Sequence, residues 1–76
     1  MPNLDDEKFL KILGNRLREA REERQWTQAQ LGDSCDLHRT FIGSVERGER
    51  NLSVLNLRLI ARKLRLSLAD LFHELV

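Results

Sequence analysis

The segment DLHRTFIGSVERGERN, residues 36 to 51, combines apolar and basic side chains in a pattern that could meet an anionic surface. Ile42 and Val45 lie three residues apart, which is the spacing of one helix face, and Gly48 follows where a left-handed residue often ends a helix. The side chains that open this short helix are polar and basic. Because the amides of a helix N-terminus already carry partial positive charge, a basic residue there favours contact with an anion. The alternative is an ordinary solvated helix end.

The outward face of this helix carries groups that could read DNA. Arg39, Thr40 and Ser44 share that face, and an arginine can pair with guanine through two hydrogen bonds in the major groove. A solvated face remains the alternative for these three residues. Phe41 belongs either to the core or to a surface that presses on the DNA backbone or a thymine methyl, and the sequence does not separate the two.

Length and composition favour a small binding domain over an enzyme. The 76 residues leave room for a limited core, and 13 basic residues nearly balance 12 acidic ones. The basic excess lies in residues 38–76. Cys35 is the single cysteine, which excludes an internal disulfide and the cysteine sets that hold structural zinc. No apolar run could span a membrane and the N-terminus is acidic. We therefore expect a cytoplasmic protein without catalytic activity, metal, cofactor or small-molecule ligand.

Helical spacing of the apolar residues predicts an all-α domain over residues 1–76. The five expected helices cover about residues 6–24, 28–35, 39–46, 54–64 and 68–75. Thr27 and Gln30 form a capping box before the second helix, and Ser53 and Ser67 precede the fourth and fifth. The second and third helices, at about 27–46, are joined by a tight turn, which is the geometry of a helix-turn-helix.

The stretch WTQAQLGDSCDLHRTFIGSVERGERNLSVLNLRLIARKLRLSLADLF resembles the lambda-repressor-like, XRE or Cro-type, helix-turn-helix family. With the preceding NRLREAREERQ, the resemblance covers about residues 14–72. Its most specific parts are the Thr27–Gln28 opening, the motif I-x-x-V-E-R-G, and the run NLRLIARKL followed by SLADLF. In a chain this short, LHRTFIGSVERGERN is similar to stand-alone controller proteins of restriction-modification systems. Gly32 replaces the usual alanine, and Asp36 and Arg65 replace the usual glycines.

The resemblance implies roles for individual residues. It implies a five-helix lambda-repressor-like fold, in which Arg21 and Glu46 form a structural ion pair. The residues expected to read bases are His38, Arg39, Thr40, Ser44 and Arg50, and His38 stands at the helix cap, where a phosphate contact is the other possibility. The residues expected to hold phosphate are Thr27, Gln28, Phe41, Arg47, Asn51 and Ser53. Capping is the alternative for Gln28, and a solvated charge run is the alternative for the loop residues.

Leu55 and Leu59 occupy positions of the fourth helix that would normally be polar, which indicates an interface. A symmetric contact between two copies would use Leu55, Leu59, Leu66, Phe72, Leu75 and Val76. The alternative is that the fifth helix covers them within one chain. We expect a homodimeric, sequence-specific regulator of transcription, activator or repressor, on a near-palindromic DNA operator, with RNA polymerase as a further candidate partner. An antitoxin-type interaction module with autoregulatory DNA binding is the alternative function.

Overall fold

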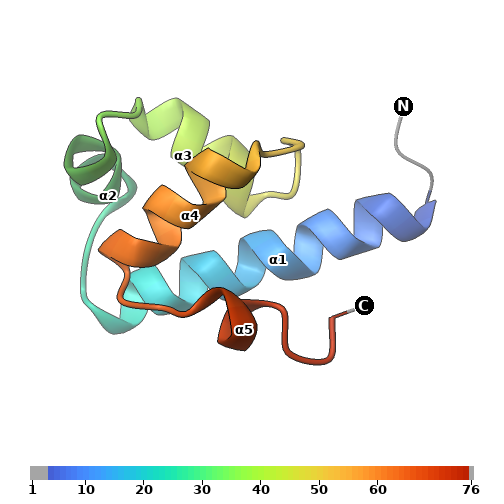
Figure 1. Ribbon diagram of the computed structural model, residues 1–76. Coiled ribbons are helices and arrows are strands. Elements are labelled where there is room, and N and C mark those ends of the chain that lie inside the picture. The colour runs from blue at the N-terminus through green and yellow to red at the C-terminus, as the bar shows by residue number, and fades with distance from the viewer. Residues whose placement is uncertain (1–3, 76) are drawn as a thin grey trace.

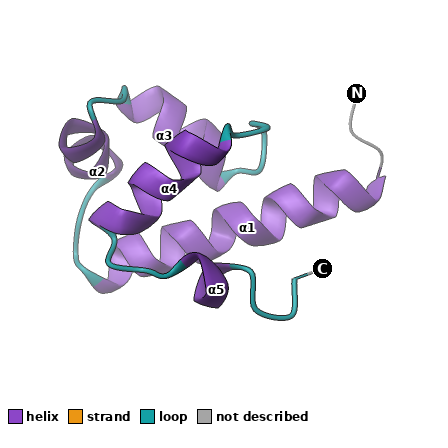
Figure 2. Ribbon diagram, viewed as in Figure 1, coloured by secondary structure: helices purple, strands orange, loops and turns teal. Residues whose placement is uncertain are grey.

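The computed structural model describes residues 4–75, and this part of the chain forms five helices and no strand. α1 spans Leu4–Glu23, α2 Gln28–Cys35, α3 Arg39–Glu46, α4 Val54–Lys63 and α5 Leu68–Leu71. The expected all-α class is confirmed. α1 is a long rod, and the shorter helices gather around its C-terminal half (Figure 1, Figure 2). None of the helices in residues 4–75 combines the length and apolar character needed to cross a membrane.

The apolar stripe of α1 forms one wall of the core. Leu13, Leu17 and Ala20 recur at helical spacing and are buried. Acidic residues fill the first turn of α1, where they interact favourably with the positive end of the helix dipole. The other helices close the core over this stripe with the buried residues Leu31, Cys35, Ile42, Val45, Leu57, Ile60, Leu64 and Leu71.

α2 and α3 form the helix-turn-helix. Thr27 caps α2 through a capping box, in which its hydroxyl accepts from the Gln30 amide at 3.0 Å and the Gln30 side chain accepts from the Thr27 amide at 2.8 Å. Residues 36–38 join the two helices. A Cβ on Gly32 would lie 2.5 Å from the backbone oxygen of Leu37. The turn therefore comes so close to α2 that any residue larger than glycine at position 32 would require the backbone to shift.

The first four helices end in the same way, with a left-handed residue followed by an amide that bonds back to the carbonyl five residues earlier. The left-handed residues are Gln25, Asp36, Gly48 and Arg65, with φ of 58°, 57°, 75° and 55°. The closing bonds run from Trp26 to Arg21, Leu37 to Gly32, Glu49 to Ser44 and Leu66 to Ala61. Glycine adopts this conformation freely, whereas a Cβ makes it unfavourable, so three of the four ends carry backbone strain.

α5 is shorter than the expected range of 68–75, which was wrong at its C-terminal end. The Arg16 guanidinium of α1 donates to the carbonyls of Leu71 and His73, at 2.9 and 2.7 Å. These carbonyls are thereby satisfied without further helical turns. Glu74, with φ 57°, then turns the chain. Arg16 thereby ties residues 71–73 to α1.

Candidate nucleic-acid interface

The first turn of α3 presents Arg39 and Thr40 to solvent. The Arg39 guanidinium has no hydrogen bond or ion pair with another residue in the described range 4–75. α3 is fixed from behind, because Ile42 and Val45 are buried in the core. A free guanidinium therefore projects from a rigid helix start whose amides add partial positive charge. This arrangement suits an anionic partner with hydrogen-bond acceptors, such as the major groove of DNA.

His38 is the N-cap of α3 and uses one ring nitrogen for this purpose. Its Nδ1 accepts from the Thr40 amide at 3.0 Å and lies 2.6 Å from Thr40 Oγ1. Because Nδ1 is an acceptor, the neutral ring carries its proton on Nε2. The residue is exposed, so the Nε2–H group remains for a phosphate or a base. His38 can thus cap the helix and donate to a ligand at the same time.

Ser44 does not share the outward face, so that expectation was wrong. The residue is only 9% exposed, and its hydroxyl donates to the Phe41 carbonyl at 2.7 Å. The same oxygen accepts from Arg50 Nε at 3.2 Å. Its one proton and a lone pair are therefore used within the protein, which leaves Ser44 no donor for a base edge.

Arg50 lies over the aromatic ring of Phe41 in the loop after α3. The guanidinium carbon is 5.3 Å from the ring centroid, which is a cation–π distance. Phe41 is half-buried and also packs against the hydrophobic core. The two alternatives for Phe41, core and surface, are thus combined in one side chain. No sequence motif predicted the contact between Phe41 and Arg50, because this contact depends on how the loop after α3 folds back over the helix.

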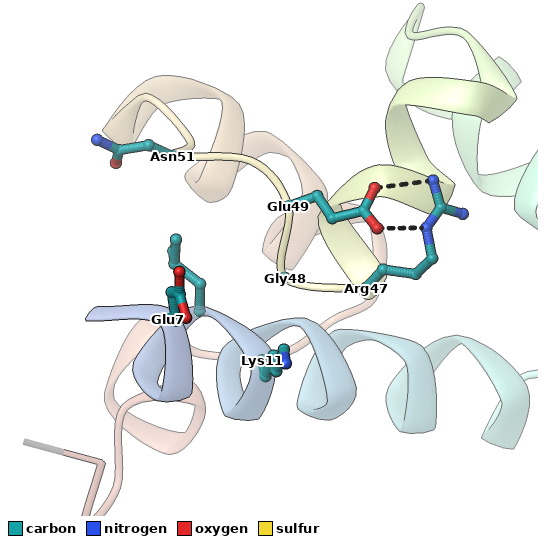
Figure 3. A pocket seen from close by; sticks show the side chains of 7 residues that line it. Glu7, Lys11, Arg47, Gly48, Glu49 and Asn51 are labelled. Carbon is teal, nitrogen blue, oxygen red and sulfur yellow. Dashed lines mark hydrogen bonds and ion pairs between the residues drawn. The ribbon is translucent and has the colours of Figure 1, made fainter. Parts of the chain in front are cut away.

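Arg47, the other arginine of this loop, is engaged by Glu49. It donates from Nε at 3.1 Å and from Nη2 at 3.2 Å (Figure 3). The pair raises the pKa of Arg47 and lowers the pKa of Glu49, so both groups are charged at neutral pH and offset one another. An open hollow of about 570 Å³ lies between this loop and α1, lined in part by Lys11 and Asn51 (Figure 3). The phosphate contacts of Arg47 and Asn51 stay predictions.

At the starts of α2 and α4, backbone amides are more available to a phosphate than the side chains, which are hydrogen-bonded within the protein. Gln28 Nε2 donates to Glu46 Oε1 at 3.0 Å, and Thr27 Oγ1 is used in the capping box. Ser53 likewise caps α4 by accepting from the Asn56 amide at 3.1 Å. Phosphate contacts at these three positions therefore depend chiefly on the amides of the first helical turns, which have no partner inside the helix.

A buried ion pair between Arg21 and Glu46 joins α1 to the C-terminal end of α3. Arg21 Nε is 2.7 Å from Oε2 and Nη2 is 3.0 Å from Oε1, while Nη1 donates to the Trp26 carbonyl at 2.6 Å. The hydrogen bond to Glu46 raises the pKa of Arg21, so the guanidinium stays charged despite its burial. With Gln28, this pair joins α1, α2 and α3.

The apolar residues expected at a dimer interface are unequally exposed. Leu55 in the first turn of α4 is 73% exposed, and its neighbour Val54, which the sequence pattern did not single out, is 72% exposed. The other residues of the set are half-buried and pack against the core: Leu59, Leu66, Phe72 and Leu75. Phe72 stacks on Phe9 of α1 with ring centroids 6.1 Å apart. Val76 lies outside the described residues. Among the described residues expected at the interface, Leu55 is therefore the one that is largely exposed.

Cys35 is buried in the core, with its sulfur 3.8 Å from the Ser34 hydroxyl. Burial raises the pKa of its thiol, and a neutral buried thiol is a weak nucleophile. Across residues 4–75, no three His, Cys, Asp or Glu side chains are grouped in a way that could hold a metal ion.

Comparisons with known proteins agree on the type of domain. The profile of the family HTH_3, described as Helix-turn-helix, matches residues 17–71. Control protein C.MunI of Mycoplasma sp is 36% identical over 63 residues, which cover 82% of this chain and 85% of that protein. The restriction-modification controller protein C.AhdI of Aeromonas hydrophila has a crystal structure with a TM-score of 0.79 and 38% identity, covering 83% of this chain and 96% of that one. C.Esp1396I, solved as a tetramer with its natural 35 base-pair operator, has a TM-score of 0.77 and 33% identity, covering 88% of each chain.

Proposed function

Because this chain belongs to the helix-turn-helix family HTH_3, we propose that it is a sequence-specific DNA-binding regulator of transcription of the restriction-modification controller type. It acts by binding double-stranded DNA and not by catalysis. The observation that carries the proposal is the exposed guanidinium of Arg39 at the start of α3, which has no hydrogen-bond or ion-pair partner among residues 4–75. The relatives indicate that the ligand is DNA, and the exposed position of the Arg39 guanidinium supports a contact with it.

In this proposal α3 lies in the major groove with its first turn towards the bases. Arg39 pairs with the acceptor edge of a guanine, and Thr40 contacts a neighbouring base. His38 contributes its Nε2–H group, and Arg50 reaches a further base edge from the loop. Ser44 is removed from this set because its hydroxyl is used inside the protein.

Phosphates flanking the bases are held by helix starts and by the loop after α3. The amides at the starts of α2 and α4 point at the backbone of the DNA, as do the caps Thr27 and Ser53 with Gln28 beside them. The loop adds Arg47 and Asn51, and the edge of Phe41 packs beside the DNA backbone. These contacts fix the orientation of α3 but carry no sequence information by themselves.

Two copies bind one operator in this proposal. A dimer sets its recognition helices one DNA turn apart, about 34 Å, and so requires a near-palindromic site. The exposed Leu55, with its half-buried apolar neighbours, supplies the contact between copies. The operator-bound tetramer of the relative C.Esp1396I supports the assembly of several copies on DNA. A regulator that activates from such a site also contacts RNA polymerase.

The test is binding to the DNA upstream of the protein's own gene, measured by gel shift across a range of salt concentrations. The wild type should prefer this DNA over a scrambled sequence by roughly 10³-fold or more, with an affinity that falls steeply as salt rises. Arg39→Ala should lower operator affinity by about 1–3 kcal/mol and leave binding to scrambled DNA nearly unchanged. Arg62→Ala, which removes an exposed arginine from the last turn of α4, is the matched control.

Two results would change the proposal. An equal loss of affinity for both DNAs after Arg39→Ala would assign Arg39 to phosphate instead of bases. A wild-type protein that does not distinguish its upstream region from scrambled DNA would overturn sequence-specific regulation at that site.

A further inference from the structure

Arg50 is held in place by two residues of the recognition helix. Ser44 Oγ accepts a hydrogen bond from Arg50 Nε at 3.2 Å, and the Phe41 ring lies beneath the guanidinium at 5.3 Å. We infer that Ser44 and Phe41 are positioning residues, which hold Arg50 in the conformation that contacts DNA. This inference rests on the proposed function and adds to it the means by which the loop acquires specificity.

The atom that Ser44 engages leaves the useful edge of the guanidinium free. An arginine side chain has five N–H donors, one on Nε and four on the two Nη atoms. The Nε–H group is used by Ser44, and no hydrogen bond to another residue in 4–75 involves the Nη atoms. Parallel N–H groups of the two Nη atoms make a two-point contact with the acceptors of guanine or a phosphate. Arg50 is therefore held through Nε, while both Nη atoms remain available for DNA.

The orientation of the Ser44 hydroxyl is set by the helix backbone. Its proton is donated to the Phe41 carbonyl at 2.7 Å, so a lone pair of the oxygen is left for Arg50. The Ser44 carbonyl also accepts from the Glu49 amide at 2.9 Å, which closes the helix end through the left-handed Gly48. Ser44 thus turns the loop back over α3 with its backbone and holds Arg50 with its side chain.

The two arginines of the loop are held in different ways. Arg47 is paired in two-point fashion with Glu49, which uses one Nη atom and offsets its charge. Arg50 is held by a neutral hydroxyl and an aromatic ring, so its charge is undiminished. Arg50, and not Arg47, is consequently the cation of this loop that is prepared for an anionic ligand.

Holding Arg50 before binding raises affinity by reducing the ordering that binding requires. A free arginine side chain has many rotamers and loses that freedom when it is fixed on a base or phosphate. A side chain that is already ordered in the free protein loses less, which is the general advantage of preorganisation. Loss of either support should therefore weaken DNA binding although neither Ser44 nor Phe41 need touch a base.

A double-mutant cycle on operator DNA tests this coupling. Ser44→Ala should weaken operator binding roughly threefold to tenfold in the wild-type background, the range expected for the net contribution of one typical hydrogen bond. The same change should have almost no effect in the Arg50→Ala background, because there is no guanidinium left to position. Melting temperatures of all variants establish that they are folded. Phe41→Leu removes the ring beneath the guanidinium, and it should weaken operator binding more in the wild-type background than in the Arg50→Ala background.

A measurement on the free protein complements the cycle. In ¹⁵N-edited NMR spectra, the Arg50 Nε–H signal should exchange slowly with water and be shifted by the Phe41 ring. Ser44→Ala should increase that exchange rate, which a purely structural role in the loop backbone would not do.

The outcomes separate the two levels of the proposal. Equal losses from Ser44→Ala in both backgrounds would overturn the positioning role and leave specific DNA binding intact. Unchanged operator affinity in Arg50→Ala would overturn it as well, again without affecting the role of Arg39. A wild-type protein that does not discriminate its operator would remove the proposed function and, with it, the role of this contact.

Discussion

The Arg21 guanidinium and the Glu46 carboxylate meet through two buried hydrogen bonds, 2.7 and 3.0 Å long, which join α1 to the end of α3. Gln28 adds a third hydrogen bond to the same carboxylate from α2. Glu46, the last residue of α3, thus fixes the position of α3 relative to α1 and α2. The proposed DNA contacts of α3 depend on this fixed position.

Neutralising Glu46 should destabilise the domain strongly. Glu46→Gln leaves the Arg21 guanidinium buried without a compensating charge, and we expect the free energy of unfolding to fall by about 3 kcal/mol. Chemical denaturation of the wild type and the variant measures this difference.

The second Arg–Glu pair of the chain provides the control. Arg47 and Glu49 make a two-point contact of the same kind, but their side chains are largely exposed. Glu49→Gln should leave the denaturation midpoint nearly unchanged, because exposed ion pairs add little stability. Equal losses in the two variants would mean that the burial of Arg21 and Glu46 is not what makes their pair important.

Arg65 should be replaceable by glycine with a gain in stability. Its φ of 55° lies in the left-handed region, which is unfavourable for a residue with a Cβ. Arg65→Gly removes that strain and adds chain entropy to the unfolded state, so we expect a net gain of about 0.5–1 kcal/mol. Thermal unfolding should then shift upward by roughly 3–6 °C for a domain of this size.

Gly48 is the reciprocal test at a matching helix end. Its φ is 75°, and a Cβ there would lie 2.7 Å from the backbone of Lys11 in α1. Gly48→Ala should therefore lower the melting temperature, since it introduces both strain and a clash. A stable Gly48→Ala protein together with a destabilised Arg65→Gly protein would contradict the assignment of strain to these ends.

Cys35 should make stability depend on pH in the alkaline range. Burial raises the pKa of the thiol in the folded protein, whereas the unfolded chain has the ordinary value of about 8.5. Below that value both states hold the proton and stability is unaffected. As pH rises above it, the unfolded chain loses its proton first, so the free energy of unfolding falls until the folded thiol also ionises.

The difference between wild type and Cys35→Ala isolates this effect from other titrating groups. Denaturation at about pH 7 and about pH 9.5 should show the wild type losing more stability than the variant. Alkylation of the folded wild type should also be slow and should become fast in denaturant. Rapid alkylation without denaturant would show that the thiol is accessible and would contradict its burial.

Sequence reasoning succeeded where the signals are local. The start of α2 follows from the capping box of Thr27 and Gln30, whose partners are three residues apart. Sequence reasoning failed where the structure of a segment involves a contact with a residue far away in the sequence. The carbonyl of Leu71, where α5 ends, accepts a hydrogen bond from Arg16, which lies 55 residues away in the sequence. Helical periodicity contains no record of such a contact.

Ser44 shows a second kind of failure. The periodicity of α3 placed it near the outward face with Arg39, yet the loop folds back and buries it under Arg50. A helical pattern describes the faces of an isolated helix and cannot show which face a following loop will cover. The same loop contact gives Phe41 its two environments, which the sequence could only state as alternatives.

Leu55 should control the association of two copies. It is 73% exposed at the start of α4, where a large apolar side chain in water indicates an interface. Leu55→Glu should shift the sedimentation mass from twice the 8.9 kDa chain to a single chain, with the helical content retained. Operator binding should weaken markedly, because a monomer engages one half-site at a time.

Leu4→Glu is the matched control for that experiment, since Leu4 is 72% exposed but lies at the start of α1, outside the expected contact surface. The same substitution at similar exposure changes the charge of the chain equally, so any difference between the variants reflects position alone. A Leu4→Glu protein that dissociates while Leu55→Glu stays dimeric would move the interface to α1. It would also change the distance between the two recognition helices, and therefore the half-site spacing that the operator must have.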